Sequence, residues 1–141
     1  EPVLHCDLAP DNLIVTENDT IKLIDFDVAR IEGKGATGQV AARPAYTPPE
    51  QFRGKPGIQS DLYAFGAIVH FLFHGKDPSP FGQTSSAEEV ELSEIERLVR
   101  DCCQFDAGAR PESARVILER VASLSNSLKI PLVLPEKDRT A

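Results

Sequence analysis

Three oxygen-bearing side chains near the start of the chain have the types and the spacing to carry out chemistry on a phosphate. Asp7 and Asn12 lie five positions apart in a segment that contains Pro10, and Asp25 follows thirteen residues after Asn12. One carboxylate can orient an attacking hydroxyl, while an amide oxygen and a second carboxylate can hold Mg²⁺ on the phosphates of a nucleotide. The set predicts phosphoryl transfer, although an isolated loop of this kind could equally use Asp and Asn to cap backbone groups.

A β-hairpin is the element that must bring these side chains together. Residues 13–16 and 20–24 are rich in β-branched side chains, and residues 17–19 between them, Glu-Asn-Asp, are typical of a turn. Asn12 stands at the entrance of this hairpin and Asp25 at its exit. We therefore expect two residues that are distant in the sequence to share one metal site.

A central buried helix is predicted next. Residues 62–73 are apolar almost throughout, which indicates a helix at the centre of a domain. Ser60 or Asp61 is expected to cap its start, and Gly75 with Pro78 to end it.

Two further helices are expected toward the C-terminus. Apolar side chains recur at helical spacing over residues 92–102, and Ser93 with Glu96 forms a capping box. A last helix is expected over residues 111–124, with Pro111 in its first turn. Its apolar face should consist of Ala114, Ile117, Leu118 and Val121.

Composition and charge limit the possible functions. The 141 residues are 41% hydrophobic and 26% charged, as in one soluble globular domain with a real core. A net charge of −7 argues against nucleic acid or an anionic membrane as a partner. No segment is long and apolar enough to cross a bilayer, and no signal peptide is visible. The cysteines lack zinc-binding spacing and form no disulfide framework, so we expect a reducing, cytoplasmic location.

Several landmarks, in chain order, resemble those of the protein kinase family. Residues 5–12 read H-C-D-L-A-P-D-N, similar to the catalytic loop H-R-D-L-x-x-x-N, and residues 25–27 read D-F-D where the metal-binding motif is D-F-G. Residues 48–50 (P-P-E) and 61–66 (D-L-Y-A-F-G) match the end of an activation segment and the start of the family's central helix. Residues 110–111 (R-P) match an arginine near the end of the fold.

The resemblance implies a fold and a division of the chain. It covers residues 1–125 and implies an α+β, mainly helical fold: the C-terminal lobe of a protein kinase, with a small β-hairpin that carries the metal-binding residues. Residues 126–141 are expected to be a linker or tail. No G-x-G-x-x-G of an N-terminal lobe occurs, so we expect a fragment of a longer product that is inactive alone.

The resemblance also implies roles at the nucleotide. Asp7 is expected to orient the substrate hydroxyl and accept its proton, and Asn12 and Asp25 to bind Mg²⁺. Ile14 is expected to lie under the adenine ring of ATP, although an ordinary strand-core position explains this residue equally well.

Other landmark residues are expected to support the site. By the same resemblance, His5, Phe26 and Asp61 should stack or bond behind the catalytic residues. Glu50 and Arg110 should form a buried ion pair that ties the activation segment to the lower helices.

Some residues depart from the family pattern. Cys6 replaces an arginine that holds a phosphate on the activation loop, so a phosphate on Thr37 would lack its usual partner. Ala9 replaces a lysine that touches the transferred phosphate. Arg43 stands where a threonine would bond the catalytic aspartate, and Asp27 replaces a flexible glycine. Metal binding is expected to be intact, and phosphate steering to be weakened.

The leading interpretation is a serine/threonine protein kinase that uses ATP and Mg²⁺ on a protein substrate, because Pro10 favours this type over tyrosine kinases. A pseudokinase that serves as a binding or regulatory module is an alternative, supported by the departures above. A small-molecule kinase of the aminoglycoside or choline type would suit residues 24–27 (I-D-F-D), but it should lack the P-P-E, D-L-Y-A-F-G and R-P landmarks.

Overall fold

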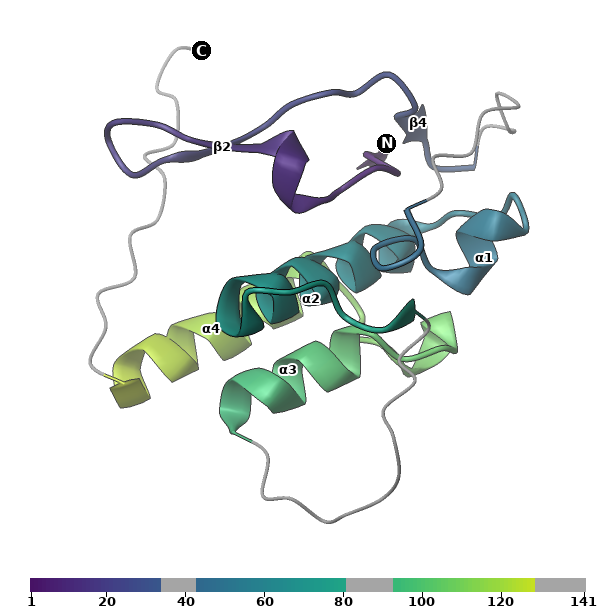
Figure 1. Ribbon diagram of the computed structural model, residues 1–141. Coiled ribbons are helices and arrows are strands. Elements are labelled where there is room, and N and C mark those ends of the chain that lie inside the picture. The colour runs from purple at the N-terminus through teal and green to yellow at the C-terminus, as the bar shows by residue number, and fades with distance from the viewer. Residues whose placement is uncertain (34–42, 81–92, 129–141) are drawn as a thin grey trace.

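The computed structural model describes residues 1–33, 43–80 and 93–128 of the chain. Helices predominate over two small sheets, in agreement with the α+β class. In Figure 1 the strands occupy one layer above the helices, and helix α1 lies near the end of that layer at which β4 is found. None of the helices in these three segments is long and apolar enough to span a membrane.

Both sheets are antiparallel pairs of strands. The strands are β1 (Val3–Leu4) paired with β4 (Arg30–Ile31), and β2 (Leu13–Val15) paired with β3 (Ile21–Leu23). The 3-10 helix η1 (Pro10–Asn12) leads directly into β2. The hairpin predicted from the β-branched runs is confirmed, since Leu13 faces Leu23 and Val15 faces Ile21 in its ladder.

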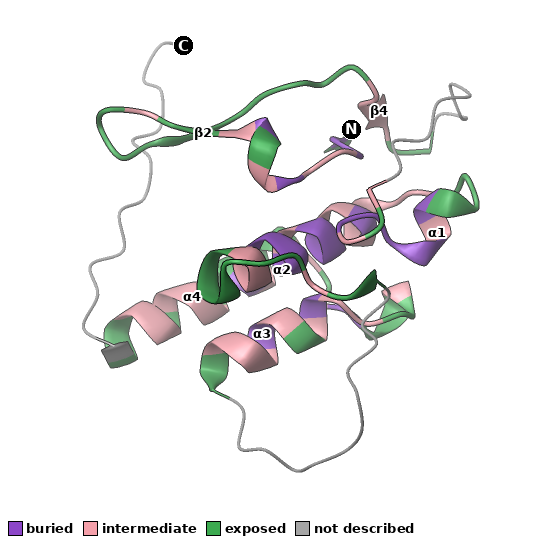
Figure 2. Cartoon of the chain, viewed as in Figure 1, coloured by how far each residue is buried: buried purple, intermediate pink, exposed green. Residues whose placement is uncertain are grey.

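Most of the hairpin formed by β2 and β3 faces solvent (Figure 2). Val15 and Ile21 are 67% and 61% exposed, and Ile14 is 47% exposed. An interior strand position therefore does not describe Ile14, and the apolar surface of the hairpin is available for contact.

Helix α2 (Ile58–His74) is the longest of the described helices and begins earlier than predicted. Its N-cap is Gly57, so the expectation that Ser60 or Asp61 caps it is wrong. Ser60 instead reaches back from inside the first turn and accepts a hydrogen bond from the Gly57 amide at 3.0 Å. Gly75 ends the helix in the left-handed conformation (φ 67°), as predicted from its place after the last apolar residue.

The core surrounds α2 from Ser60 to Ile68. Leu72 and Phe73, near its end, are 68% and 62% exposed, so the helix is not buried along its whole length as expected. One cluster of buried side chains comprises Ala9, Tyr46, Ala67 and Ile68; the other comprises Leu62, Leu98, Cys102 and Ile117. Because Ala9 belongs to the first cluster, the core directly supports the loop that contains Asp7.

The remaining helices are α1 (Pro49–Phe52), α3 (Glu94–Cys102), η3 (Ala107–Ala109) and α4 (Ala114–Leu128). The predicted capping box of α3 is present, with the Glu96 amide donating to Ser93 Oγ at 3.2 Å. Helix α4 begins after Ser113, whose Oγ accepts from the Val116 amide at 3.4 Å, so Pro111 lies outside the helix rather than in its first turn. The helix also continues to Leu128, beyond the predicted end.

The apolar face predicted for α4 is only partly buried. Ile117 belongs to the core and Val121 packs against it, whereas Ala114 and Leu118 are exposed. Helical periodicity identified four neighbouring positions, of which two are exposed in the structure.

Gly66 permits a close approach of α2 and α3. A Cβ atom at this position would lie 2.6 Å from Cys102 Cβ and 2.9 Å from Cys103 Sγ. The spacing of the two helices therefore requires a residue without a side chain at position 66.

Candidate active site

Residues 5–12, which we call the Asp7 loop, are anchored to the start of α2 by Asp61. The Asp61 carboxylate accepts the backbone amide of His5 at 2.7 Å and that of Cys6 at 3.0 Å. Cys6 has φ 64°, a left-handed conformation that is unfavourable for a side chain with a Cβ atom and that these two bonds help to maintain. Burial raises the pKa of Asp61, and the two amide donors offset that effect only in part.

His5 connects the Asp7 loop to the exit of the hairpin. Its Nε2 lies 2.9 Å from the Ile24 carbonyl oxygen, and its Nδ1 accepts the Asp7 amide at 3.2 Å. These two contacts fit the neutral imidazole with the proton on Nε2. Phe26 packs edge-on against the ring, with centroids 4.6 Å apart. The structure therefore brings Phe26 and Asp61 into contact with His5, which is itself bonded to the Asp7 amide.

Asn12 lies directly against Asp7. Its Nδ2 donates to the Asp7 backbone oxygen at 2.7 Å and to Asp7 Oδ2 at 3.2 Å. Asn12 is only 4% exposed, so these bonds fix the direction of its amide group. With the nitrogen directed to Asp7, Oδ1 is the atom of Asn12 that could bind a cation.

Asp25 lies where the hairpin returns to the loop. The Ile24 amide donates to the Asn12 carbonyl oxygen at 3.0 Å. Asp25 therefore directly follows a residue that is hydrogen-bonded to Asn12. Asp25 has φ 61° and an exposed side chain, whose Oδ1 accepts the Asp27 amide at 3.4 Å. The hairpin thus joins the two predicted metal ligands through its backbone ladder.

The donor set of Asn12 and Asp25 fits Mg²⁺, which prefers oxygen ligands and retains several from water and phosphate. Within residues 1–33, 43–80 and 93–128, no group of three or more His, Cys, Asp or Glu side chains could enclose a metal ion. A cation held by Asn12 and Asp25 would therefore need further ligands from outside the protein.

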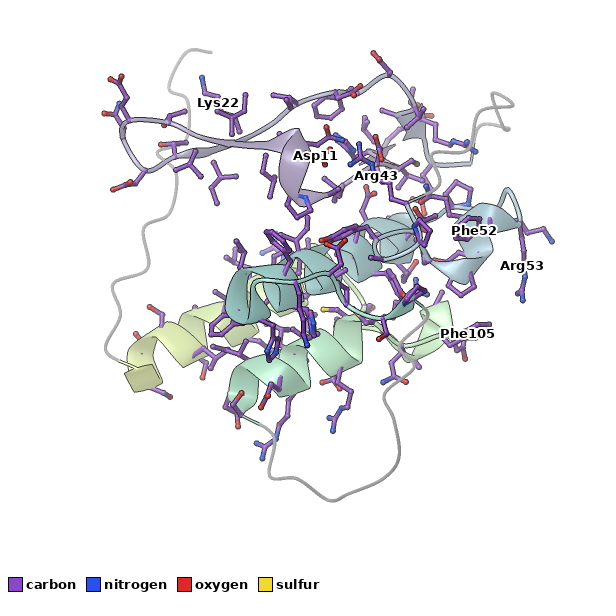
Figure 3. The ribbon with its side chains drawn as sticks, in the orientation of Figure 1. Asp11, Lys22, Arg43, Phe52, Arg53 and Phe105 are labelled. Atoms are coloured by element: carbon purple, nitrogen blue, oxygen red, sulfur yellow. The ribbon has the colours of Figure 1, made fainter. Side chains whose placement is uncertain are left out.

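Arg43 also belongs to this site, in a manner that the sequence did not predict. Its Nε lies 2.8 Å from Asp7 Oδ1, and its Nη1 donates to Asp11. Figure 3 shows the labelled Arg43 and Asp11 side chains converging beside η1. The hydrogen bond to Asp11 raises the pKa of Arg43, and the same bond lowers the pKa of Asp11. The sequence indicated only that Arg43 occupies the position where a threonine would bond the catalytic aspartate. No feature of the sequence indicated that Arg43 would also bind Asp11.

A tight turn fixes the backbone of Arg43. The Arg43 amide donates to Thr47 Oγ1 at 2.9 Å, and the Arg43 carbonyl oxygen accepts the amides of Tyr46 and Thr47, both at 2.8 Å. The Tyr46 hydroxyl in turn donates to Asp77, and burial together with this bond raises the pKa of Tyr46. The guanidinium of Arg43 is therefore presented to Asp7 from a well-anchored segment.

The Glu50–Arg110 ion pair links α1 to the segment that precedes α4. Arg110 Nη1 contacts Glu50 Oε1 at 2.6 Å and Nη2 contacts Oε2 at 3.0 Å, while Ser60 Oγ donates to Oε1 at 2.8 Å. Burial alone would raise the pKa of Glu50. The hydrogen bonds from Arg110 and Ser60 lower this pKa by more than burial raises it, so the net shift is downward. Next to Glu50, Gln51 Nε2 donates to the Cys6 carbonyl oxygen at 2.6 Å, a contact that the sequence did not suggest.

A model of the protein kinase domain matches residues 1–129 of this chain. The chain belongs to the protein kinase family. It is 26% identical to a probable serine/threonine-protein kinase of Clostridium acetobutylicum, over 89% of this chain and 22% of that protein. It is 34% identical to calcium-dependent protein kinase 27 of Arabidopsis thaliana, over 70% of this chain and 22% of that protein. The LRR receptor-like serine/threonine-protein kinase EFR of the same plant is 28% identical, over 84% of this chain.

This kinase-family chain spans between 12 and 22% of the length of these relatives. Thr37, where a phosphate is expected to lack its usual partner, lies outside the residues that the structure describes.

Proposed function

We propose that residues 1–125 form the C-terminal lobe of a serine/threonine protein kinase that transfers the γ-phosphoryl group of ATP to a hydroxyl of a protein substrate. The observation that carries this proposal is the placement of Asn12 against Asp7, with Asp25 at the adjoining exit of the hairpin. One carboxylate and two further oxygen ligands are the side chains that this reaction requires.

Asp7 is the residue that orients the acceptor hydroxyl. Its Oδ1 contacts Arg43 Nε in an ion pair, and its Oδ2 accepts a hydrogen bond from Asn12 Nδ2. A carboxylate oxygen has two acceptor positions, so the group retains capacity for the substrate hydroxyl and its proton. With the Asp7 side chain 13% exposed, only a substrate placed directly over the loop can reach it.

Asn12 Oδ1 and the Asp25 carboxylate would hold Mg²⁺, and the exposed face of Ile14 would contact the adenine of ATP. When bound, the metal neutralises charge on the phosphates and orients them for transfer. The protein contributes the fixed direction of the Asn12 amide and the backbone ladder that brings Asp25 to it.

The test uses the protein that contains this chain. Asp7→Asn should lower turnover by about 10²-fold or more and leave nucleotide affinity nearly unchanged, because a group that acts on the hydroxyl contributes little to nucleotide binding. Asp25→Asn should weaken Mg²⁺-dependent nucleotide binding. Asp19→Asn is the matched control, since Asp19 lies in the exposed hairpin turn with φ 57°. Equal turnover of wild type and Asp7→Asn would contradict the assignment.

A pseudokinase is the second candidate, and the ion pair between Arg43 and Asp7 is the observation that favours it. An aspartate that is permanently paired could be unable to receive a substrate. Mg²⁺-dependent nucleotide binding with no turnover in the wild-type protein would support this function. The small-molecule kinase alternative is less well supported, because Glu50 and Arg110, which belong to landmarks it should lack, form an ion pair.

A further inference from the structure

We propose that Arg43 supplies the positive charge that steers the transferred phosphoryl group toward the hydroxyl held at Asp7. This inference rests on the proposed function and assigns a positioning role to a residue outside the Asp7 loop. It follows from the contact of Arg43 Nε with Asp7 Oδ1 at 2.8 Å.

The chemistry creates a need for a cation at this place. During transfer, the acceptor oxygen bonds to the γ-phosphorus while the bond from that phosphorus to the β–γ bridging oxygen breaks. ADP leaves with the electron pair, and the hydroxyl proton passes to the Asp7 carboxylate. The anionic γ-phosphate must therefore approach an anionic carboxylate, which is unfavourable without a positive charge between them. The Asp7 loop, residues 5–12, contains no lysine or arginine.

Arg43 has an orientation that suits this task. Its Nε is directed to Asp7 and its Nη1 to Asp11, so two positions of the guanidinium are fixed by carboxylates. Among the residues that the structure describes, no acceptor bonds to Nη2, and the side chain is 35% exposed. A guanidinium held in this way can still donate to a phosphate oxygen through its free edge.

Hydrogen bonds at the backbone and at the end of the side chain fix the position of the Arg43 charge. The turn that contains Thr47 holds the Arg43 backbone, and Asp11 holds the far end of the side chain. The Asp11 carboxylate accepts from Nη1 of Arg43 in an ion pair. A preorganised cation of this kind needs no rearrangement when charge develops on the phosphoryl group.

The test compares Arg43→Gln and Arg43→Lys in the full-length protein. Removal of the charge in Arg43→Gln should lower kcat by about 10- to 100-fold, and Arg43→Lys should restore part of it, because lysine keeps the charge but not the fork. Calorimetry provides a second readout: Arg43→Gln should weaken Mg-ATP binding more than Mg-ADP binding, since only ATP has the phosphate that faces Arg43. Arg53→Gln is the control and should change neither quantity, because Arg53 lies on α1's side of the molecule, away from Asp11 (Figure 3).

The outcomes separate this proposal from the proposed function. If Asp7→Asn does not change turnover, the kinase assignment itself fails. If Asp7→Asn inactivates the protein while Arg43→Gln keeps wild-type turnover and the wild-type ratio of ATP to ADP affinity, only the role of Arg43 is overturned. Increased turnover of Arg43→Gln would likewise overturn it and identify the ion pair as inhibitory. Should the wild type lack turnover, the affinity ratio of Arg43→Gln against wild type decides. Should Arg43→Gln fail to fold, the uncharged variant Arg43→Met takes its place, and an unchanged ratio counts against the proposal.

Discussion

The Arg110 guanidinium, whose side chain has no exposed surface, binds both carboxylate oxygens of Glu50, a residue 60 positions earlier in the chain. Three carbonyl oxygens, of Gln59, Gln104 and Phe105, accept its remaining N–H groups. The pair therefore joins α1 to the start of α2 and to the segment before η3. All of these bonds depend on one buried charge.

Loss of the Glu50 carboxylate should destabilise the fold strongly. Glu50→Gln leaves the charge of Arg110 buried without its counter-ion, and we expect the free energy of unfolding to fall by about 3–5 kcal/mol. Urea unfolding of the full-length protein, followed at the transition of this domain, measures the change. The control is Glu94→Gln, which removes an ion pair with Arg97 whose side chains are 61% and 43% exposed, and which should cost less than about 1 kcal/mol. A similar small loss for both variants would show that the buried pair contributes no more than a surface one.

The same carboxylate predicts an acid-dependent loss of stability. The folded-state pKa of Glu50 lies below the ordinary value of 4.5, so folding favours the ionised form. Its contribution is therefore fully present above about pH 4.5 and is lost as the pH falls through the folded-state pKa. Unfolding midpoints of wild type should decline over that window more steeply than those of Glu50→Gln. Parallel curves for the two proteins would assign the acid sensitivity to other groups.

Substitution of Gly66 should separate α2 from α3. Gly66→Ala places a methyl group 2.6 Å from Cys102 Cβ, where the neighbouring helix must move. Overpacking of this kind costs about 1–3 kcal/mol, and thermal unfolding measures it. Gly57→Ala is the control, because its Cβ would meet only Gln59 Oε1, at an ordinary 3.6 Å. An unchanged melting temperature for Gly66→Ala would mean that the two helices can separate without cost.

The cysteines should be unreactive in the folded protein. Burial raises the pKa of Cys6 to about 11, that of Cys102 to about 11 and that of Cys103 to about 12, from an ordinary value of 9.0. A shift of two units lowers the thiolate fraction near neutral pH by about 10²-fold. Reaction with a chromogenic disulfide reagent should be slow before and rapid after denaturation. Rapid labelling of Cys6 in the native protein would show that the Asp7 loop opens frequently.

The sequence was most informative where local pattern and tertiary structure agree. Runs of β-branched residues on both sides of a polar turn predicted the hairpin, and the hairpin placed Asn12 and Asp25 at its two ends. The partnership of Glu50 and Arg110 was expected from the resemblance to the protein kinase family, although nothing local joins them. Gly75 ended α2 as expected because no other residue adopts its left-handed conformation as easily.

Other features depend on contacts that no local pattern encodes. Ser60 and Asp61 both suit an N-cap, but Ser60 donates to Glu50 and Asp61 binds two amides of the Asp7 loop, so the helix starts before them. The meeting of Arg43 with Asp11 requires the fold, since a surface charge gives no indication of its partner. Leu118 has the periodicity of a core residue, yet it is 48% exposed.

The anchoring of the Asp7 loop by Asp61 has a consequence for amide hydrogen exchange. The amides of His5 and Cys6 bond to a residue of the core helix, so they should exchange only when the start of α2 opens. The amides of β2 and β3 belong to a ladder with mostly exposed side chains, and they should exchange through frequent local opening. Asn12 and Asp25 thus lie at the boundary between a slowly exchanging unit and a rapidly exchanging one. A ligand that bridges them would slow exchange mainly in the hairpin.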